Sequence, residues 1–148
     1  MNVLLLNGPN LNLLGEREPE IYGTTTLSQL ESLVAERARE LGVALRTFKS
    51  NHEGALVDRL QEVRKWADGV IFNPGAYTHY SYALRDAISA ARLRVVEVHL
   101  TDISQREPWR QVSVISDVAA HRIQGKGIAG YLEALEWLVA HPRSAESG

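Results

Sequence analysis

The stretch VLLLNGPNLNLLGEREPEIYG, residues 3–23, decides how the rest of the chain is interpreted. Its unbroken apolar run, residues 3–6, is typical of a strand buried on both faces of a sheet. The next residues, 7–10, are of the types that favour a backbone turn. The chain then continues as a long loop instead of entering a helix at once, and such loops in compact domains usually carry function. Because this loop contains Arg17 and Tyr22, we predict that it acts as a lid over a site.

Beyond this stretch, apolar periodicity alternates between the strand and helix patterns. Thr26 and Gln29 have the spacing of a capping box, and Gly42 is a natural helix end. Thr78 or Ser81 is expected to cap the third helix. The pattern predicts strands over residues 43–48, 69–72, 94–100 and 122–124, helices over 27–41, about 56–66, 81–91 and 128–140, and a short helical turn over 116–120.

Strands that alternate with helices through short connections indicate a parallel sheet covered on both faces. We predict an α/β fold, a flavodoxin-like doubly wound three-layer sandwich with a five-stranded parallel sheet. Residues 1–141 form a single catalytic domain and 142–148 a flexible tail in this interpretation. Right-handed crossovers place every strand-to-helix loop at the carboxyl edge of the sheet, where ligands of such folds bind. The loops brought together there are 7–23, 50–54, 73–81 and 99–110.

Composition excludes several classes of function. The 148 residues carry a net charge of −2, which gives no electrostatic reason to expect nucleic acid or an anionic membrane as a partner. The absence of cysteine excludes disulfides, thiolate chemistry and zinc–cysteine sites. No basic n-region precedes the short apolar run at residues 3–6, and no run approaches the roughly 18 residues needed to span a bilayer. We therefore expect a cytoplasmic protein.

The candidate side chains of the four loops are rich in amides and arginines, include two histidines and no lysine, and contain few carboxylates. Such groups suit a small hydroxylated or carboxylated anion, with histidine transferring protons. A tyrosine beside arginine can become a general base, because the guanidinium stabilises the phenolate. No cofactor is expected, and two histidines without convergent carboxylates make a weak metal-ligand set. The candidate side chains of these loops are Asn7, Asn10, Asn12, Arg17, Tyr22, Asn51, Glu53, Asn73, Tyr77, His79, His99, Thr101, Arg106 and Arg110.

Each of these residues also has a structural interpretation when it is taken alone. Tyr22 is more often a loop anchor than a base, and His99 at a strand end is more often hydrogen-bonded structure than a catalyst. The glycines flanking Lys126 lack a phosphate-loop motif and favour a simple turn. A receiver-type signalling domain of the same fold would need acids where this chain has Asn7 and Asn73. A non-catalytic homologue that binds a similar acid is the other alternative.

The sequence resembles type II 3-dehydroquinate dehydratase of the shikimate pathway, in register from about residue 3 to 138. The motifs that carry the resemblance are NGPNLNLLG at 7–15 with REP at 17–19 and YG at 22–23, SNHEG at 50–54, NPGAYTH at 73–79, and EVHL at 97–100 followed by Arg106, Glu107 and Arg110. The resemblance implies a hydro-lyase that converts 3-dehydroquinate to 3-dehydroshikimate and water by anti elimination through an enolate, without a Schiff base.

The resemblance also implies a role for each matching residue. Tyr22 would be the base that removes the proton from C2, and His99 the acid that protonates the departing hydroxyl. Arg17 and Arg106 would stabilise the charge that develops, Asn10 would hold a water at the enolate, and Glu97 would orient His99. The residues that would bind substrate are Asn73, His79, Leu100, Thr101 and Arg110. The family further implies a homo-oligomer, a dodecamer built from trimers, in which Asp86 reaches a neighbouring subunit's site.

Three positions depart from the family pattern. Thr101 replaces a more frequent serine but keeps the hydroxyl. Asp102 replaces an asparagine and adds a negative charge near an anion site, which predicts weaker binding. The segment AHRIQGK, residues 120–126, is more polar than the apolar strand expected there, which bears on the packing of the fifth strand and on the subunit contact.

Overall fold

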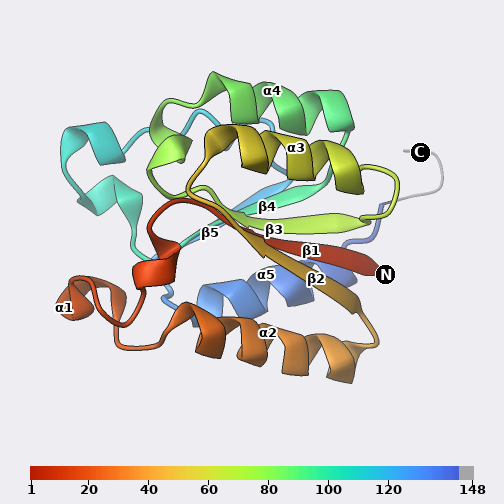
Figure 1. Cartoon of the computed structure of the whole chain (residues 1–148), viewed down its shortest axis with the longest axis horizontal. Helices are drawn as coiled ribbons and strands as arrows, with labels where there is room; N and C mark the ends of the chain where they lie inside the picture. The colour runs from red at the N-terminus through yellow and green to blue at the C-terminus, as the bar shows by residue number, and fades with distance from the viewer. Residues whose placement is uncertain (144–148) are drawn as a thin grey trace.

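The computed structural model describes residues 1–143 and contains a five-stranded parallel sheet between two layers of helices (Figure 1). The strand order is β2-β1-β3-β4-β5, so the chain reverses direction across the sheet after β2, as in a doubly wound fold. The predicted fold class is confirmed. The strands are β1 (Asn2–Asn7), β2 (Ala44–Lys49), β3 (Gly69–Asn73), β4 (Val95–His99) and β5 (His121–Gln124).

Each face of the sheet has its own apolar core, because successive side chains of a strand point to opposite faces. Leu5 of β1 packs in the core covered by α2 (Leu27–Leu41) and α5 (Ala129–Ala140). Its neighbour Leu4 packs in the other core, under α3 (Glu53–Val63) and α4 (Tyr82–Ala91). Figure 1 shows these two pairs of helices on opposite sides of the sheet. The run 3–6 is therefore fully buried, as predicted.

The helix ends follow local sequence signals. Gln29 N donates to Thr26 Oγ1 at 3.1 Å, and Thr26 N donates to Gln29 Oε1 at 2.9 Å, which completes the predicted capping box of α2. Gly42 ends this helix in the left-handed conformation, with φ of 71°. Ser81 caps α4 by accepting from Leu84 N at 3.1 Å. Thr78, the other candidate cap, instead donates its hydroxyl proton to Glu97.

Several boundaries differ from the predictions. The loop of residues 7–23 is not structureless: it contains the 3₁₀ turn η1 (Leu11–Leu13) and the helix α1 (Pro19–Tyr22). Pro19 favours the first helical position because its fixed φ suits a helix start. Helix α3 ends at Val63, not at about residue 66, and residues 116–120 form hydrogen-bonded turns without a helix. The remaining 3₁₀ turns are η2 (Gly75–His79), η3 (Ile103–Gln105) and η4 (Pro108–Arg110).

The polar fifth strand pairs with β4 in parallel, from Val96 opposite His121 to His99 opposite Gln124. Ile123 is its one buried side chain, with 3% of its surface exposed. A strand at the edge of a sheet tolerates polar residues because one side of it has no neighbouring strand. The polarity of 120–126 is thus compatible with regular pairing. Residues 144–148 of the predicted tail lie outside the described residues. The domain boundary predicted at residue 141 stays a prediction.

None of the helices within residues 1–143 has the length and apolar character needed to cross a membrane.

Candidate active site

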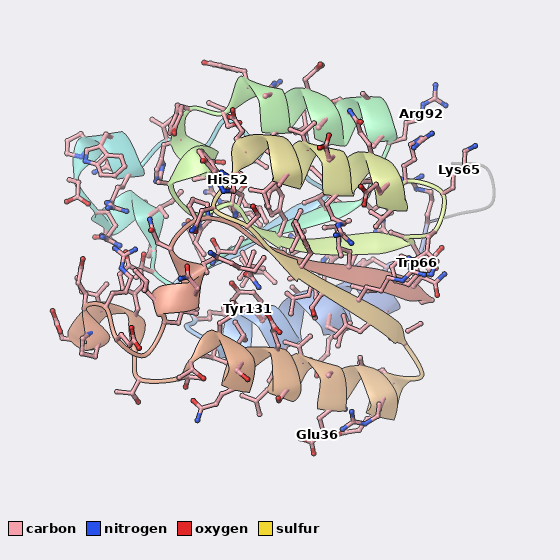
Figure 2. The ribbon with its side chains drawn as sticks, in the orientation of Figure 1. Glu36, His52, Lys65, Trp66, Arg92 and Tyr131 are labelled. Carbon is pink, nitrogen blue, oxygen red and sulfur yellow. The ribbon has the colours of Figure 1, made fainter. Side chains whose placement is uncertain are left out.

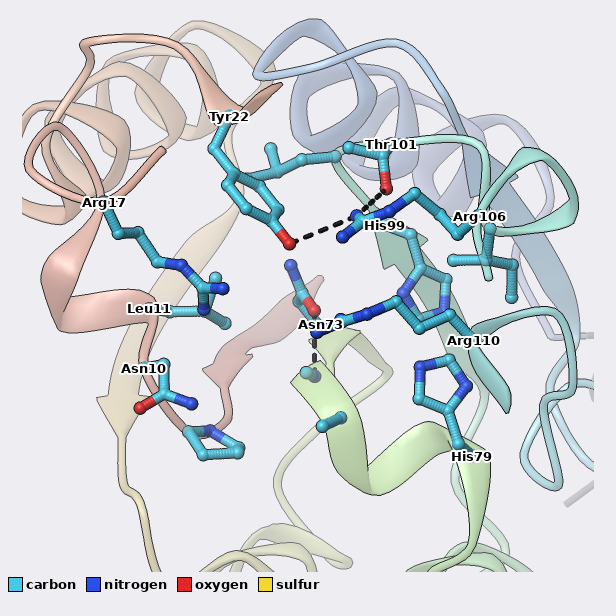
Figure 3. Close-up of a pocket in the computed structure, with 15 residues that line it drawn as sticks. Asn10, Leu11, Arg17, Tyr22, Asn73, His79, His99, Thr101, Arg106 and Arg110 are labelled. Carbon is cyan, nitrogen blue, oxygen red and sulfur yellow. Dashed lines mark hydrogen bonds between the residues drawn. The ribbon is translucent and has the colours of Figure 1, made fainter. Parts of the chain in front are cut away.

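A cavity of about 120 Å³ opens at the carboxyl edge of the sheet, where the ends of β1, β3 and β4 meet the loops that follow them (Figure 3). Three of the four loops that the sequence predicted to converge, 7–23, 73–81 and 99–110, supply its lining, and loop 50–54 supplies none of it. The residues around it are Pro9, Asn10, Leu11, Arg17, Tyr22, Asn73, Gly75, Ala76, His79, His99, Leu100, Thr101, Ile103, Arg106 and Arg110.

Tyr22 lies in this cavity between two guanidinium groups. Arg106 Nη1 donates to the Tyr22 hydroxyl oxygen at 3.2 Å and to Thr101 Oγ1 at the same distance. The guanidinium carbon of Arg17 lies 4.7 Å from the centre of the Tyr22 ring. Figure 3 shows both arginines directed toward the phenol. Two guanidinium groups therefore lie close to this phenol, one at its hydroxyl oxygen and one beside its ring.

The backbone of the loop fixes this position of Tyr22. Tyr22 is the last residue of α1, and Gly23 follows it with a positive φ of 83°. At Gly15, a Cβ would lie 2.9 Å from the carbonyl oxygen of Thr24, so only glycine permits the loop to fold back on itself there. The loop therefore carries its tyrosine inward over the cavity.

His99 is held by a buried carboxylate. His99 Nε2 lies 2.5 Å from Glu97 Oε2, and Glu97 has no exposed surface. Three hydroxyl groups also donate to this carboxylate: Thr78 at 2.6 Å, Ser113 at 2.8 Å and Ser116 at 2.6 Å. The carboxylate of Glu97 accepts a hydrogen bond from the Nε2–H group of His99. Nδ1 is therefore the ring nitrogen of His99 that is available to the cavity.

Burial by itself raises the pKa of Glu97, but this effect is outweighed. The hydrogen bond and charge of His99, with the hydroxyls of Ser116 and Thr78, lower the pKa to about 2. Glu97 is consequently an anion at neutral pH. An ionised Glu97 accepts the hydrogen bond from His99 and holds the imidazole in one orientation.

Sequence reasoning did not identify the hydroxyl groups around Glu97. Ser113 and Ser116 follow Arg110 in the segment VSVIS, residues 112–116, which has no motif character. The only feature of the sequence that could have indicated Ser113 and Ser116 is their spacing of three residues in a loop, and this spacing is common in turns. Leu11 and Ile103 form apolar walls of the cavity that sequence reasoning also missed, because an apolar residue in a loop carries no signal of a site.

His79 occupies the opposite side of the cavity from Tyr22 in Figure 3. Its Nδ1 donates to the carbonyl oxygen of Val112 at 2.6 Å, so Nε2 is the nitrogen left for a ligand. Burial lowers the pKa of His79 despite this hydrogen bond, and the charge of Arg110 adds to the lowering. Arg110 itself lies beside Glu107, with 2.5 Å between Nε and Oε1.

Two asparagines are held in place by their neighbours. Asn73 Oδ1 accepts from Gly75 N at 3.0 Å, and Asn73 Nδ2 donates to the Tyr131 hydroxyl at 2.8 Å. Asn10 has a left-handed backbone with φ of 70°, and its N–H donates to Asn51 Oδ1 at 3.1 Å. Both amides thus reach the cavity from a fixed backbone.

Of the residues to which the resemblance gives a role, two do not line the cavity, and neither do the further loop candidates Asn7, Asn12, Asn51, Glu53 and Tyr77. Glu97 lies behind His99, as its expected orienting role requires, and Asp86 is an exposed residue of α4. Asp102 does not line it either: its Oδ1 accepts from Ser104 N at 3.0 Å and from Ser104 Oγ at 2.5 Å. Its negative charge is therefore directed at a turn. Within residues 1–143, no three His, Asp or Glu side chains are grouped as a metal site.

Comparison with known proteins gives a consistent result. The family model described as dehydroquinase class II matches residues 1–139. A 3-dehydroquinate dehydratase from Roseiflexus castenholzii is 52% identical over 139 residues, which cover 94% of this chain and 88% of that protein. A catabolic 3-dehydroquinase from Aspergillus oryzae is 50% identical over 145 residues, covering 98% of this chain and 95% of that one.

Among solved structures, the type II dehydroquinase from Butyrivibrio crossotus is similar with a TM-score of 0.92 and 41% identity. The match covers 93% of this chain and 97% of that one. Sequence, fold and arrangement of the site thus lead to the same conclusion: the chain belongs to the class II dehydroquinase family.

Proposed function

We propose that this chain dehydrates 3-dehydroquinate to 3-dehydroshikimate, with Tyr22 as the base and His99 as the acid. Membership of the class II dehydroquinase family supports the hydro-lyase activity. The observation that supports the choice of base is the contact between Arg106 and the Tyr22 hydroxyl, with Arg17 beside the ring. These two positive charges lie where the proposed phenolate would carry its negative charge.

In the first step, the Tyr22 phenolate removes a proton from C2 of the substrate. The electron pair of the broken C–H bond moves toward the C3 carbonyl and gives an enolate. Asn10, which faces the cavity, would hold a water that donates to the enolate oxygen. Arg17 and Arg106 balance the negative charge while it moves from the phenolate to the substrate.

In the second step, the enolate re-forms the carbonyl and expels the C1 hydroxyl. Protonated His99 gives its proton to that oxygen, so water leaves. Buried Glu97 stays ionised and holds the imidazole in one orientation. The proton on Tyr22 returns to His99 through solvent and completes the cycle. None of the residues within 1–143 that line the cavity is a lysine, which supports a route without a Schiff base.

The remaining polar groups are proposed to bind the substrate. Arg110 offers a guanidinium to the carboxylate, together with the hydroxyl of Thr101 and the backbone at Leu100. His79 and Asn73 offer hydrogen bonds to substrate hydroxyls. All five residues line the cavity, which supports this assignment.

The assembly is proposed from the family resemblance: a cytoplasmic homo-oligomer, a dodecamer built from trimers. The exposed position of Asp86 on α4 is compatible with a contact to a neighbouring subunit's site. Relatives of this chain include proteins named as catabolic as well as proteins named only for the dehydratase reaction, so the metabolic direction is left open.

The test is to add 3-dehydroquinate to the purified protein and follow the ultraviolet absorbance of the conjugated enone product. Absence of this signal from folded protein would contradict the proposed activity. Borohydride added during turnover should leave no covalent adduct, as judged by intact-protein mass. A trapped lysine adduct would replace the enolate route with a Schiff-base route.

A further inference from the structure

A buried tyrosine on α5 has no part in the chemistry described above. Tyr131 has no exposed surface, and Figure 2 shows it between α5 and the sheet. Its ring packs in the apolar core on that face. A phenol hydroxyl in such a place needs hydrogen-bond partners, because an unpaired polar group in an apolar core is costly.

The partners of Tyr131 are two asparagines at the ends of neighbouring strands. Asn7 of β1 and Asn73 of β3 lie opposite one another in the sheet register. Tyr131 accepts from Asn73 Nδ2 at 2.8 Å and donates to Asn7 Oδ1 at 2.7 Å. Asn7 is fully buried and Asn73 is 4% exposed, so water does not compete strongly for these bonds. The three side chains form one buried chain that ends at the cavity.

This chain fixes which end of the Asn73 amide is available. Asn73 Oδ1 is occupied by Gly75 N at 3.0 Å, and one N–H of Nδ2 is occupied by Tyr131. The second N–H of Nδ2 is the hydrogen-bonding group left over. An N–H group can bind only an acceptor, such as a carbonyl, carboxylate or hydroxyl oxygen. Without the Tyr131 hydroxyl, the Asn73 amide loses the acceptor that keeps its nitrogen directed toward α5.

Burial raises the pKa of Tyr131, and the hydrogen bond from Asn73 offsets only part of this effect. The hydroxyl therefore keeps its proton at physiological pH and remains a donor to Asn7. Because the hydroxyl proton is donated to Asn7 Oδ1, the lone pairs of the hydroxyl oxygen are left to accept from Asn73.

We propose that Tyr131 is a positioning residue: through its hydroxyl it holds the Asn73 amide so that an N–H donor faces an oxygen of the substrate. The inference rests on the proposed function, in which Asn73 binds the substrate. Tyr131 itself touches no substrate in this scheme.

The test begins with Tyr131→Phe, which removes the hydroxyl and keeps the ring that fills the core. We expect KM for 3-dehydroquinate to rise about tenfold while kcat changes less than about twofold, because the lost bond serves binding in ground and transition states alike. An unchanged KM would overturn the proposal. If the Phe variant does not fold, Tyr131→Leu removes the same hydroxyl and carries the same expectation.

A double-mutant cycle with Asn73→Ala separates this proposal from the function proposed for Asn73. If Tyr131 acts through Asn73, Tyr131→Phe has no further effect on KM in the Asn73→Ala background. Additive effects would overturn the positioning role. If Asn73→Ala alone leaves KM unchanged, the assignment of Asn73 fails first. If Asn73→Ala raises KM and Tyr131→Phe does not, only the inference about Tyr131 fails.

A matched control distinguishes positioning from general loss of stability. Val34→Ala removes apolar volume from the same core, on α2 and away from the cavity. This variant should lower Tm while KM stays at the wild-type value. If Val34→Ala raises KM as much as Tyr131→Phe does, loss of packing in this core is sufficient to explain the change in KM. That result would overturn the specific role of the Tyr131 hydroxyl.

Discussion

His99 Nε2 lies 2.5 Å from the Oε2 atom of Glu97, a carboxylate with no exposed surface at all. A buried charge is tolerated only where partners compensate its lost hydration. Here the compensation comes from the imidazole and from three hydroxyl groups on two separate segments. This arrangement connects the stability of the protein with the protonation of its proposed acid.

Replacing Glu97 with Gln should lower kcat by about 100-fold with little change in KM. The neutral amide removes the negative charge beside the imidazole, and only one of its two ends can accept a hydrogen bond from Nε2. Steady-state absorbance assays at several substrate concentrations measure both constants. A kcat within twofold of wild type would remove Glu97 from the orienting role.

The same pair predicts how stability depends on pH. The folded-state pKa of Glu97, about 2, lies below the usual value of 4.5. Its ionisation therefore stabilises the folded state above pH 4.5, and the contribution is lost as pH falls toward 2. Urea unfolding measures the free energy of unfolding at each pH. Between pH 6 and pH 3, this free energy should fall by about 1 to 3 kcal/mol more for the wild type than for Glu97→Gln. Parallel pH profiles for the two proteins would contradict this.

Tyr22→Phe should reduce kcat by at least about 1,000-fold, because phenylalanine has no group that can accept the C2 proton. Substrate should still bind, since the ring and both arginines remain. Calorimetric titration of the variant with 3-dehydroquinate measures that binding. Near-normal turnover would exclude Tyr22 as the base.

Arg106→Gln should lower kcat by about 10- to 100-fold, because it removes a positive charge in contact with the Tyr22 hydroxyl. The matched control is Arg64→Gln, the same change at an exposed residue just after α3. The control should retain wild-type kcat under the same assay. Equal losses in the two variants would indicate an effect of net charge and not of the contact.

Asp102→Asn should leave KM within about twofold of wild type. The carboxylate is engaged by Ser104, and asparagine at this position can accept from Ser104 N in the same way. Measurement of KM at low ionic strength is the most sensitive test, because screening is weakest there. A severalfold fall in KM would mean that the charge of Asp102 does weaken anion binding, as the sequence alone suggested.

The fold, and the edge of the sheet at which the site lies, could be predicted from the sequence. Residues 3–6 are apolar at every position, which requires burial on both faces, and Leu4 and Leu5 do enter opposite cores. Thr26 and Gln29 form a cap within a single turn, so local chemistry was sufficient to predict it. Topological rules then place the ends of β1, β3 and β4 together.

Only the tertiary structure decided which side chains meet at that edge and how each one is turned. Ser113 and Ser116 reach Glu97, and Tyr131 reaches Asn73 from 58 residues away. Asp102 turns toward its own loop. Such contacts depend on the packing of segments that are distant in sequence, whereas propensity and periodicity report on neighbours along the chain. Local pattern therefore fixes the positions of the strand ends, and long-range packing fixes the hydrogen bonds that prepare Tyr22, His99 and Asn73.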